Sequence, residues 1–139
     1  MYETVYNAYC TYITGFNHSG DKVNNIATFN LIKSNNFNAY SEFEKNMKKT
    51  LEKYAPSLKG WHVLSRNGSV TRSENAWNFL TIDTFESMAD ANKVWWSEIP
   101  QKINESNTKK YGSVSDLRVI QHRVVTRLLF DAKNGKFEN

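Results

Sequence analysis

Four consecutive stretches decide the fold of this chain: NIATFNLIK (Asn25–Lys33), NAYSEFEKNMKKTLEKY (Asn38–Tyr54), KGWHVLSR (Lys59–Arg66) and AWNFLTIDTF (Ala76–Phe85). The first, third and fourth are short and rich in aromatic and β-branched residues, which is typical of strands. In the second, apolar residues recur every three or four positions, which predicts a helix with one apolar face. These residues are Tyr40, Phe43, Met47, Leu51 and Tyr54.

The ends of these elements carry their own signals. Asn38 is expected to cap the helix, because its side chain can accept from a free backbone N–H of the first turn. Pro56 is expected to end it, because the residue before a proline avoids helical geometry. Asn67-Gly68 is a tight-turn dipeptide and predicts a hairpin between the third and fourth stretches.

The rest of the chain repeats the plan. Apolar residues at helical spacing predict a second helix over 85–99, with Thr84 as its cap and Pro100 just past its end. Residues 101–115 are polar and are expected to form a loop with at most one helical turn. Residues 118–130 predict a last strand. Ahead of the four stretches, residues 2–14 predict an extra strand, followed by a polar loop.

The predicted order is β-α-β-β-α-β behind an extra N-terminal strand. This is an α+β fold of the ferredoxin-like type, in which two helices cover one face of a four-stranded antiparallel sheet. With 139 residues we expect a single such domain. Its predicted limits are 25–130, preceded by the extra strand and loop over 1–24 and followed by a polar tail over 131–139.

The uncovered face of this sheet is expected to be apolar. We assign to it Thr28, Trp77, Phe79, Thr81 and Val125. A surface of this kind does not face water in a monomer, so the pattern predicts a homodimer formed through the open sheet face.

Composition excludes several classes of protein. One cysteine rules out an intrachain disulfide, and a net charge of +4 suits an anionic ligand without indicating nucleic acid. No apolar run approaches the roughly 18 residues that a membrane span needs, so no membrane association is expected. The first residues show no signal-peptide pattern. We therefore expect a cytoplasmic protein, or one whose leader has been removed.

The stretches quoted above, with Gly60-Trp61 opening one strand and Asn78-Phe79-Leu80-Thr81-Ile82 in the next, resemble the dimeric α/β-barrel superfamily. Within it they are similar to small bacterial proteins of unknown function, and the resemblance spans Asn25–Leu129. It implies two ferredoxin-like subunits paired sheet to sheet, with a pocket between sheet and helices. Members include cofactor-free quinone-type monooxygenases, haem-degrading enzymes, chlorite dismutases and proteins without known chemistry.

The resemblance also bears on cofactors. Haem-degrading members of the superfamily use an axial histidine on the second helix, and residues 85–99 contain none. Haem is therefore not expected here, nor any other cofactor.

Two histidines are the candidate catalytic residues. His62 and His122 fall in predicted strands, and a pocket histidine can act as a general base near neutral pH. The alternative is a core or rim histidine satisfied by a hydrogen bond. No metal site is expected, because two histidines without further ligands fall short of the three or four that zinc needs.

Four further residues are candidates for ligand binding. Trp61 and Trp77 offer flat surfaces for stacking, and Asn30 is a polar residue within an apolar strand. Arg123 could pair with a carboxylate or phosphate, as could Arg66 and Arg127. The alternative for the tryptophans is core packing, and for the arginines solvated strand edges.

These features support two hypotheses of equal weight. In one, a small planar ligand binds between sheet and helices, with or without cofactor-free monooxygenase-like chemistry. In the other, the chain is a non-catalytic dimeric binding or structural module. A third class, an RNA-binding RRM-like domain, shares the element order, but the strand WNFLTIDTF lacks the RRM sequence pattern, so nucleic acid is not the expected partner.

Overall fold

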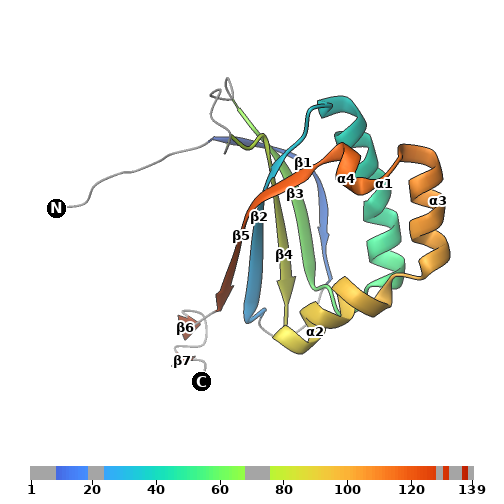
Figure 1. Cartoon of the computed structure of the whole chain (residues 1–139). Helices are drawn as coiled ribbons and strands as arrows, with labels where there is room; N and C mark the ends of the chain where they lie inside the picture. The colour runs from blue at the N-terminus through green and yellow to red at the C-terminus, as the bar shows by residue number, and fades with distance from the viewer. Residues whose placement is uncertain (1–8, 19–23, 68–75, 128–129, 132–135, 138–139) are drawn as a thin grey trace.

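One five-stranded antiparallel sheet carries all the longer helices on one of its faces (Figure 1). The computed structural model describes residues 9–18, 24–67, 76–127, 130–131 and 136–137. The strands of the sheet are β1 (Cys10–Asn17), β2 (Ile26–Lys33), β3 (Gly60–Arg66), β4 (Phe79–Phe85) and β5 (Val119–Arg127). Two short strands, β6 (Phe130–Asp131) and β7 (Lys136–Phe137), pair separately.

The helices fall in the two connections that the sequence predicts. Between β2 and β3 lies α1 (Phe37–Tyr54). Between β4 and β5 lie α2 (Met88–Lys93), the π-helix η1 (Val94–Glu98), α3 (Gln101–Tyr111) and α4 (Val114–Leu117). Of the helices among the described residues, none has the length and apolar character that crossing a membrane requires.

The sheet has the strand order β1-β3-β4-β2-β5, and every neighbouring pair is antiparallel. Its last four strands are consistent with the ferredoxin-like arrangement, and β1 extends the sheet beside β3. The predicted α+β class and the extra strand are therefore confirmed at this level. The extra strand runs to Asn17, three residues further than predicted; its predicted part before residue 9 lies outside the described residues.

The prediction for the open sheet face is wrong. Thr28, Phe79 and Thr81 are at most 2% exposed and lie on the face that the helices cover. Trp77 is also buried, in the segment before β4. Register places the other set of alternating residues on the open face: Phe29, Leu31, Leu64, Leu80, Ile82 and Val124. Alternation separates the two sets correctly, but it does not tell which set meets the helices.

Helix α1 supplies much of the core. Tyr40 and Phe79 are both fully buried, with ring centroids 4.7 Å apart in an edge-to-face arrangement. The N-cap is Asn36, whose side chain accepts from the backbone N–H of Ala39 at 3.0 Å, so the helix begins earlier than the predicted cap at Asn38. It ends at Tyr54, as Pro56 predicts.

The connection from β4 to β5 differs most from the prediction. Phe85 belongs to β4, and α2 is capped by Ser87, which accepts from the backbone N–H of Asp90, and not by Thr84. The expected loop is instead the helix α3, which buries no residue. A helix without an apolar stripe gives no periodic signal, so the pattern could not show it.

Candidate functional site

A cavity of about 360 Å³ lies between the helix-covered face of the sheet and the helices. Its walls are largely aromatic and aliphatic, and include Phe43, Met47, Leu58, Trp61, Phe85 and Trp95. Two groups of hydrogen-bonded polar side chains interrupt these walls, and all their members except Thr28 and Tyr40 line the cavity. The first, here the Asp83 cluster, consists of Thr28, Asn30, Thr81, Asp83 and Arg123. The second, the Glu44 cluster, consists of Tyr40, Glu44 and Arg118.

The Asp83 cluster is a continuous set of hydrogen bonds across three strands. The Asn30 side-chain amide donates to Thr81 Oγ1 at 2.9 Å and to Asp83 Oδ2 at 3.1 Å, and Thr28 Oγ1 donates to the same oxygen at 2.9 Å. Arg123 Nε donates to Asn30 Oδ1 at 2.6 Å. Burial raises the pKa of the Asp83 carboxyl, and the bonds from Thr28 and Asn30 only partly oppose it.

Strand register brings these residues together. Asn30 is paired with Thr81 on β4 and with Arg123 on β5, and Thr28 is paired with Asp83. Directly opposed residues of antiparallel strands point to the same face, so Asn30, Thr81, Asp83 and Arg123 meet in the cavity wall and Thr28 supports Asp83 beside it.

The Glu44 cluster joins α1 to the start of β5. Arg118 Nη1 donates to Tyr40 Oη at 3.1 Å and to Glu44 Oε1 at 3.2 Å. The Glu44 side chain is 4% exposed and that of Arg118 is 26% exposed. Burial raises the pKa of Glu44 despite the nearby guanidinium, and burial together with Glu44 raises that of Tyr40 well above its usual range.

The π-helix η1 lines the cavity with residues from the connection between β4 and β5. Trp95 packs edge-on against Phe85 at 5.6 Å between ring centroids, and the Arg123 guanidinium lies 5.3 Å from the Trp95 ring. Trp96 is 84% exposed and still contributes to the cavity lining. Single π turns occur frequently at functional sites, since they redirect side chains that a regular helix would place elsewhere.

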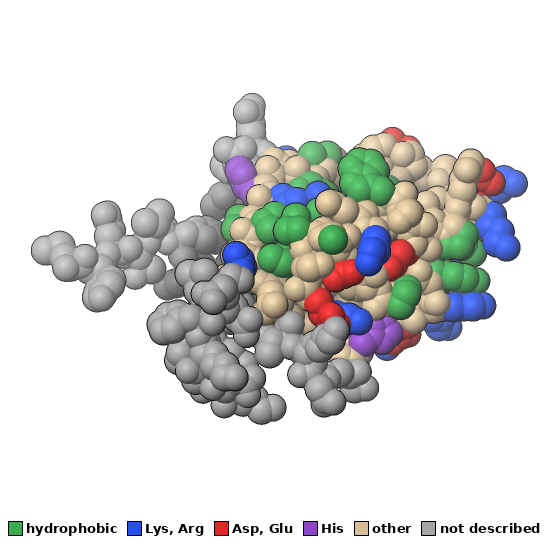
Figure 2. Space-filling view, turned by 90° about the horizontal axis from the view of Figure 1, so that it is seen from below, with side chains coloured by type: hydrophobic (Ala, Val, Ile, Leu, Met, Phe, Trp, Pro, Cys, Tyr) green, Lys and Arg blue, Asp and Glu red, His purple; other side chains and the backbone are tan. Residues whose placement is uncertain are grey.

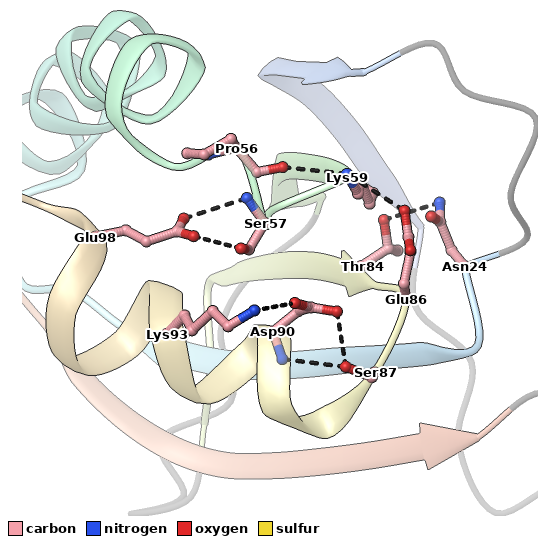
Figure 3. Close-up of polar contacts among 10 residues, drawn as sticks. All are labelled: Asn24, Pro56, Ser57, Lys59, Thr84, Glu86, Ser87, Asp90, Lys93 and Glu98. Atoms are coloured by element: carbon pink, nitrogen blue, oxygen red, sulfur yellow. Dashed lines mark hydrogen bonds and ion pairs between the residues drawn. The ribbon is translucent and has the colours of Figure 1, made fainter.

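Polar contacts tie η1 to the loop after α1, join the segments next to β3 and β4, and brace α2 internally (Figure 3). The backbone N–H of Ser57 donates to Glu98 Oε2 at 3.2 Å, and its hydroxyl donates to the other carboxylate oxygen. Lys59 pairs with Glu86 at 3.3 Å, and Lys93 with Asp90 at 2.9 Å. Seen from this end, acidic and basic side chains lie beside one another on the surface (Figure 2).

Three of the predicted site residues line the cavity: Asn30, Trp61 and Arg123. Trp77 does not. It is buried elsewhere, with its ring 5.2 Å from the Arg66 guanidinium.

The predicted catalytic histidines do not reach the cavity. His62 is paired with Ile82, and His122 with Leu31, which places both on the open face of the sheet. His62 Nε2 lies 3.0 Å from Asn17 Oδ1. None of the histidines in the described part of the chain lines the cavity, and the same part holds no cluster of three or more metal-ligating side chains.

Sequence reasoning missed Glu44, Asp83 and Arg118. Asp83 gave a usable signal, because it is an acidic residue in the alternation set of Phe79 and Thr81. Glu44 follows Tyr40 by four positions and so shares its side of α1, which was also visible in the sequence. The contact of Arg118 with Glu44 could not be predicted from the sequence, because Arg118 lies just before the last strand and only the folded structure brings the two residues together.

Comparison with known proteins shows the fold and no family. No protein-family model matches the chain, and no curated protein matches its sequence. Among solved structures, a heme-degrading enzyme from Listeria monocytogenes is similar, with a TM-score of 0.51 and 13% sequence identity over 90% of this chain and 74% of that one. At this identity the likeness indicates a shared α+β fold and leaves the chemistry open.

Proposed function

We propose that this chain binds a small, planar, partly polar organic molecule in the cavity between the sheet and the helices. The observation that carries the proposal is the meeting of aromatic walls with the Asp83 cluster in one cavity. Small-molecule sites typically combine an apolar lining with a few placed polar groups in roughly 300–1,000 Å³. The volume of about 360 Å³ falls at the lower end of that range.

The residues present do not fit haem. Haem iron is commonly held by a protein side chain such as histidine, and no histidine of the described residues lines this cavity. The heme-degrading chemistry named for the Listeria monocytogenes protein is therefore not proposed for this chain. If the bound molecule is also a substrate, the proposed chemistry is cofactor-free and monooxygenase-like. Its base is then neither His62 nor His122, because both lie on the open face of the sheet.

The proposal is tested by closing the cavity from α3. Thr108 lines the cavity and Lys109, its neighbour, does not. In saturation-transfer NMR with a set of small aromatic compounds, we expect saturable binding to the parent and to Lys109→Trp, and its loss in Thr108→Trp. If no compound binds, or if Thr108→Trp binds as the parent does, the proposal fails.

The second part of the proposal is a homodimer of ferredoxin-like subunits, paired through the open sheet face. It is supported by the apolar side chains on that face, among them Leu31 and Val124, the latter 50% exposed. Figure 1 shows the longer helices on the other side of the sheet. Contiguous apolar surface of this kind favours association with a matching surface.

Light scattering tests the dimer directly. We expect twice the chain mass of 16.1 kDa for the parent and a monomer for Leu31→Arg, whose charge would be buried at the interface. A parent that scatters as a monomer contradicts this part alone. A charge at Phe79 would not test the dimer, because Phe79 is fully buried beneath the helices and not on the open face. Its burial, with that of Trp77, takes away the two aromatic residues that favoured the RNA-binding alternative.

A further inference from the structure

Asp83 has one carboxylate oxygen that the fold does not use. Oδ2 accepts from Thr28 and Asn30, whereas Oδ1 has no hydrogen-bond partner among the described residues. Oδ1 is not fully buried, so water or a ligand can reach it from the cavity that Asp83 lines. The cavity wall therefore offers a strong acceptor to any ligand that carries a donor.

Arg123 offers the complementary donors. Its Nε is committed to Asn30 Oδ1, while its terminal nitrogens have no hydrogen-bond partner within the described part of the chain. Its guanidinium is also held over the Trp95 ring. Both ends of the Asn30 amide are engaged, so this residue acts as a spacer that fixes the carboxylate on one side and the guanidinium on the other.

We propose that Asp83 accepts a hydrogen bond, and then the proton, from the hydroxyl of a planar weak acid bound in the cavity, a phenol or an enol. The ligand O–H bond breaks, an O–H bond forms on Asp83 Oδ1, and the negative charge moves from the carboxylate to the ligand oxygen. Arg123 stabilises that oxygen by charge-assisted hydrogen bonding. This inference rests on the proposed function, because it requires the ligand to occupy the cavity.

The ligand class follows from charge and shape. A carboxylic acid, already ionised near neutral pH, would place a like charge against Asp83. An aliphatic alcohol would not release its proton to a carboxylate. The aromatic walls, with Trp61 and Trp95, favour a flat ring.

The charged groups around Asp83 support the same transfer. Burial raises its pKa, which makes it a better proton acceptor than a solvated aspartate. Glu44 on α1 is the other acidic group that interacts with it. Arg118 and Arg123 act in the opposite direction on the Asp83 pKa, and they favour an oxyanion on the ligand.

The test uses 4-nitrophenol, whose phenolate is yellow, and its methyl ether 4-nitroanisole, which has no proton to give. At mildly acidic pH, where free 4-nitrophenol is mainly neutral, we expect the parent protein to produce the phenolate absorption on binding. Asp83→Asn should bind both probes, but any phenolate that it forms must release its proton to the buffer, whereas the parent should form phenolate without net proton release because the proton moves to Asp83, as calorimetry in buffers of different ionisation enthalpy measures. Asp116→Asn, an exposed site outside the cavity lining, is the matched control and should behave as the parent.

The outcomes separate this inference from the proposed function. If 4-nitroanisole binds while 4-nitrophenol stays neutral, or if the parent releases one proton to the buffer for each phenolate formed, Asp83 is not the proton acceptor although the cavity binds ligands. If neither probe binds, both proposals fail. Arg123→Gln is a second variant that leaves Asp83 in place, and it should lower the phenolate yield several-fold; an unchanged yield would contradict the role given to its guanidinium.

Discussion

The two polar clusters of the cavity contain the same chemistry but use it differently. In the Glu44 cluster, the acid, the guanidinium and a tyrosine hydroxyl bond to one another across α1 and the start of β5. In the Asp83 cluster, an amide stands between the acid and the guanidinium, and each keeps capacity for a further partner. A cluster that satisfies itself stabilises the fold, whereas one that keeps free capacity in a cavity is suited to bind a ligand.

The largest expected effect comes from breaking the Glu44 cluster. Arg118→Leu leaves the buried Glu44 carboxylate without its cation, and we expect the free energy of unfolding to fall by roughly 3 kcal/mol, the low end for a buried pair because Arg118 is partly exposed. Chemical denaturation measures it. Lys45→Ala, which breaks the exposed pair with Glu42, is the control and should cost at most about 1 kcal/mol. Equal losses in the two variants would remove the structural role of this cluster.

A smaller loss is expected when the charge is removed and the shape is kept. Glu44→Gln retains an oxygen that can accept from Arg118, and because burial already raises the pKa of the Glu44 carboxyl, the loss at neutral pH should be at most about 1 kcal/mol. The same denaturation series tests it. A variant less stable than Arg118→Leu would show that the carboxylate, and not the unpaired charge, dominates the energetics of the cluster.

Removing the charge of Asp83 should cost less still, because no cation is bonded to its carboxylate. Because the folded state raises the pKa of Asp83, this group contributes most to stability at low pH, and the contribution is lost as pH rises through its folded pKa. Asp83→Asn, whose amide oxygen can still accept from Thr28 and Asn30, should therefore melt at the parent temperature or slightly above it at neutral pH. This advantage should shrink on acidification. A large loss of melting temperature at neutral pH would instead make Asp83 a structural residue like Glu44.

The smallest effect is expected with hemin. Because the cavity lacks a histidine among the described residues, incubation with hemin should give no saturable change in the Soret band. A stoichiometric Soret shift that disappears in His122→Ala would overturn this and would identify His122 as an iron ligand from the open face.

The sequence predicted the element order because each strand and α1 carry their own periodic pattern. It failed at α3, where polar residues form a helix without an apolar stripe, and at the identity of the open sheet face, where both alternating sets contain apolar residues. Asn30 was recognised as a polar residue in an apolar strand. Its partners were not, because register and the path of the second connection decide which side chains meet it.

The central claim, that Asp83 is held ready for a ligand, is tested most directly by the carbon NMR resonance of its carboxyl group. The resonance is followed against pH in the free protein and in the protein saturated with 4-nitrophenol. We predict that Asp83 titrates above the usual range of an aspartate and that the probe changes its titration markedly. A titration within the usual range of an aspartate that does not respond to the probe would contradict the claim.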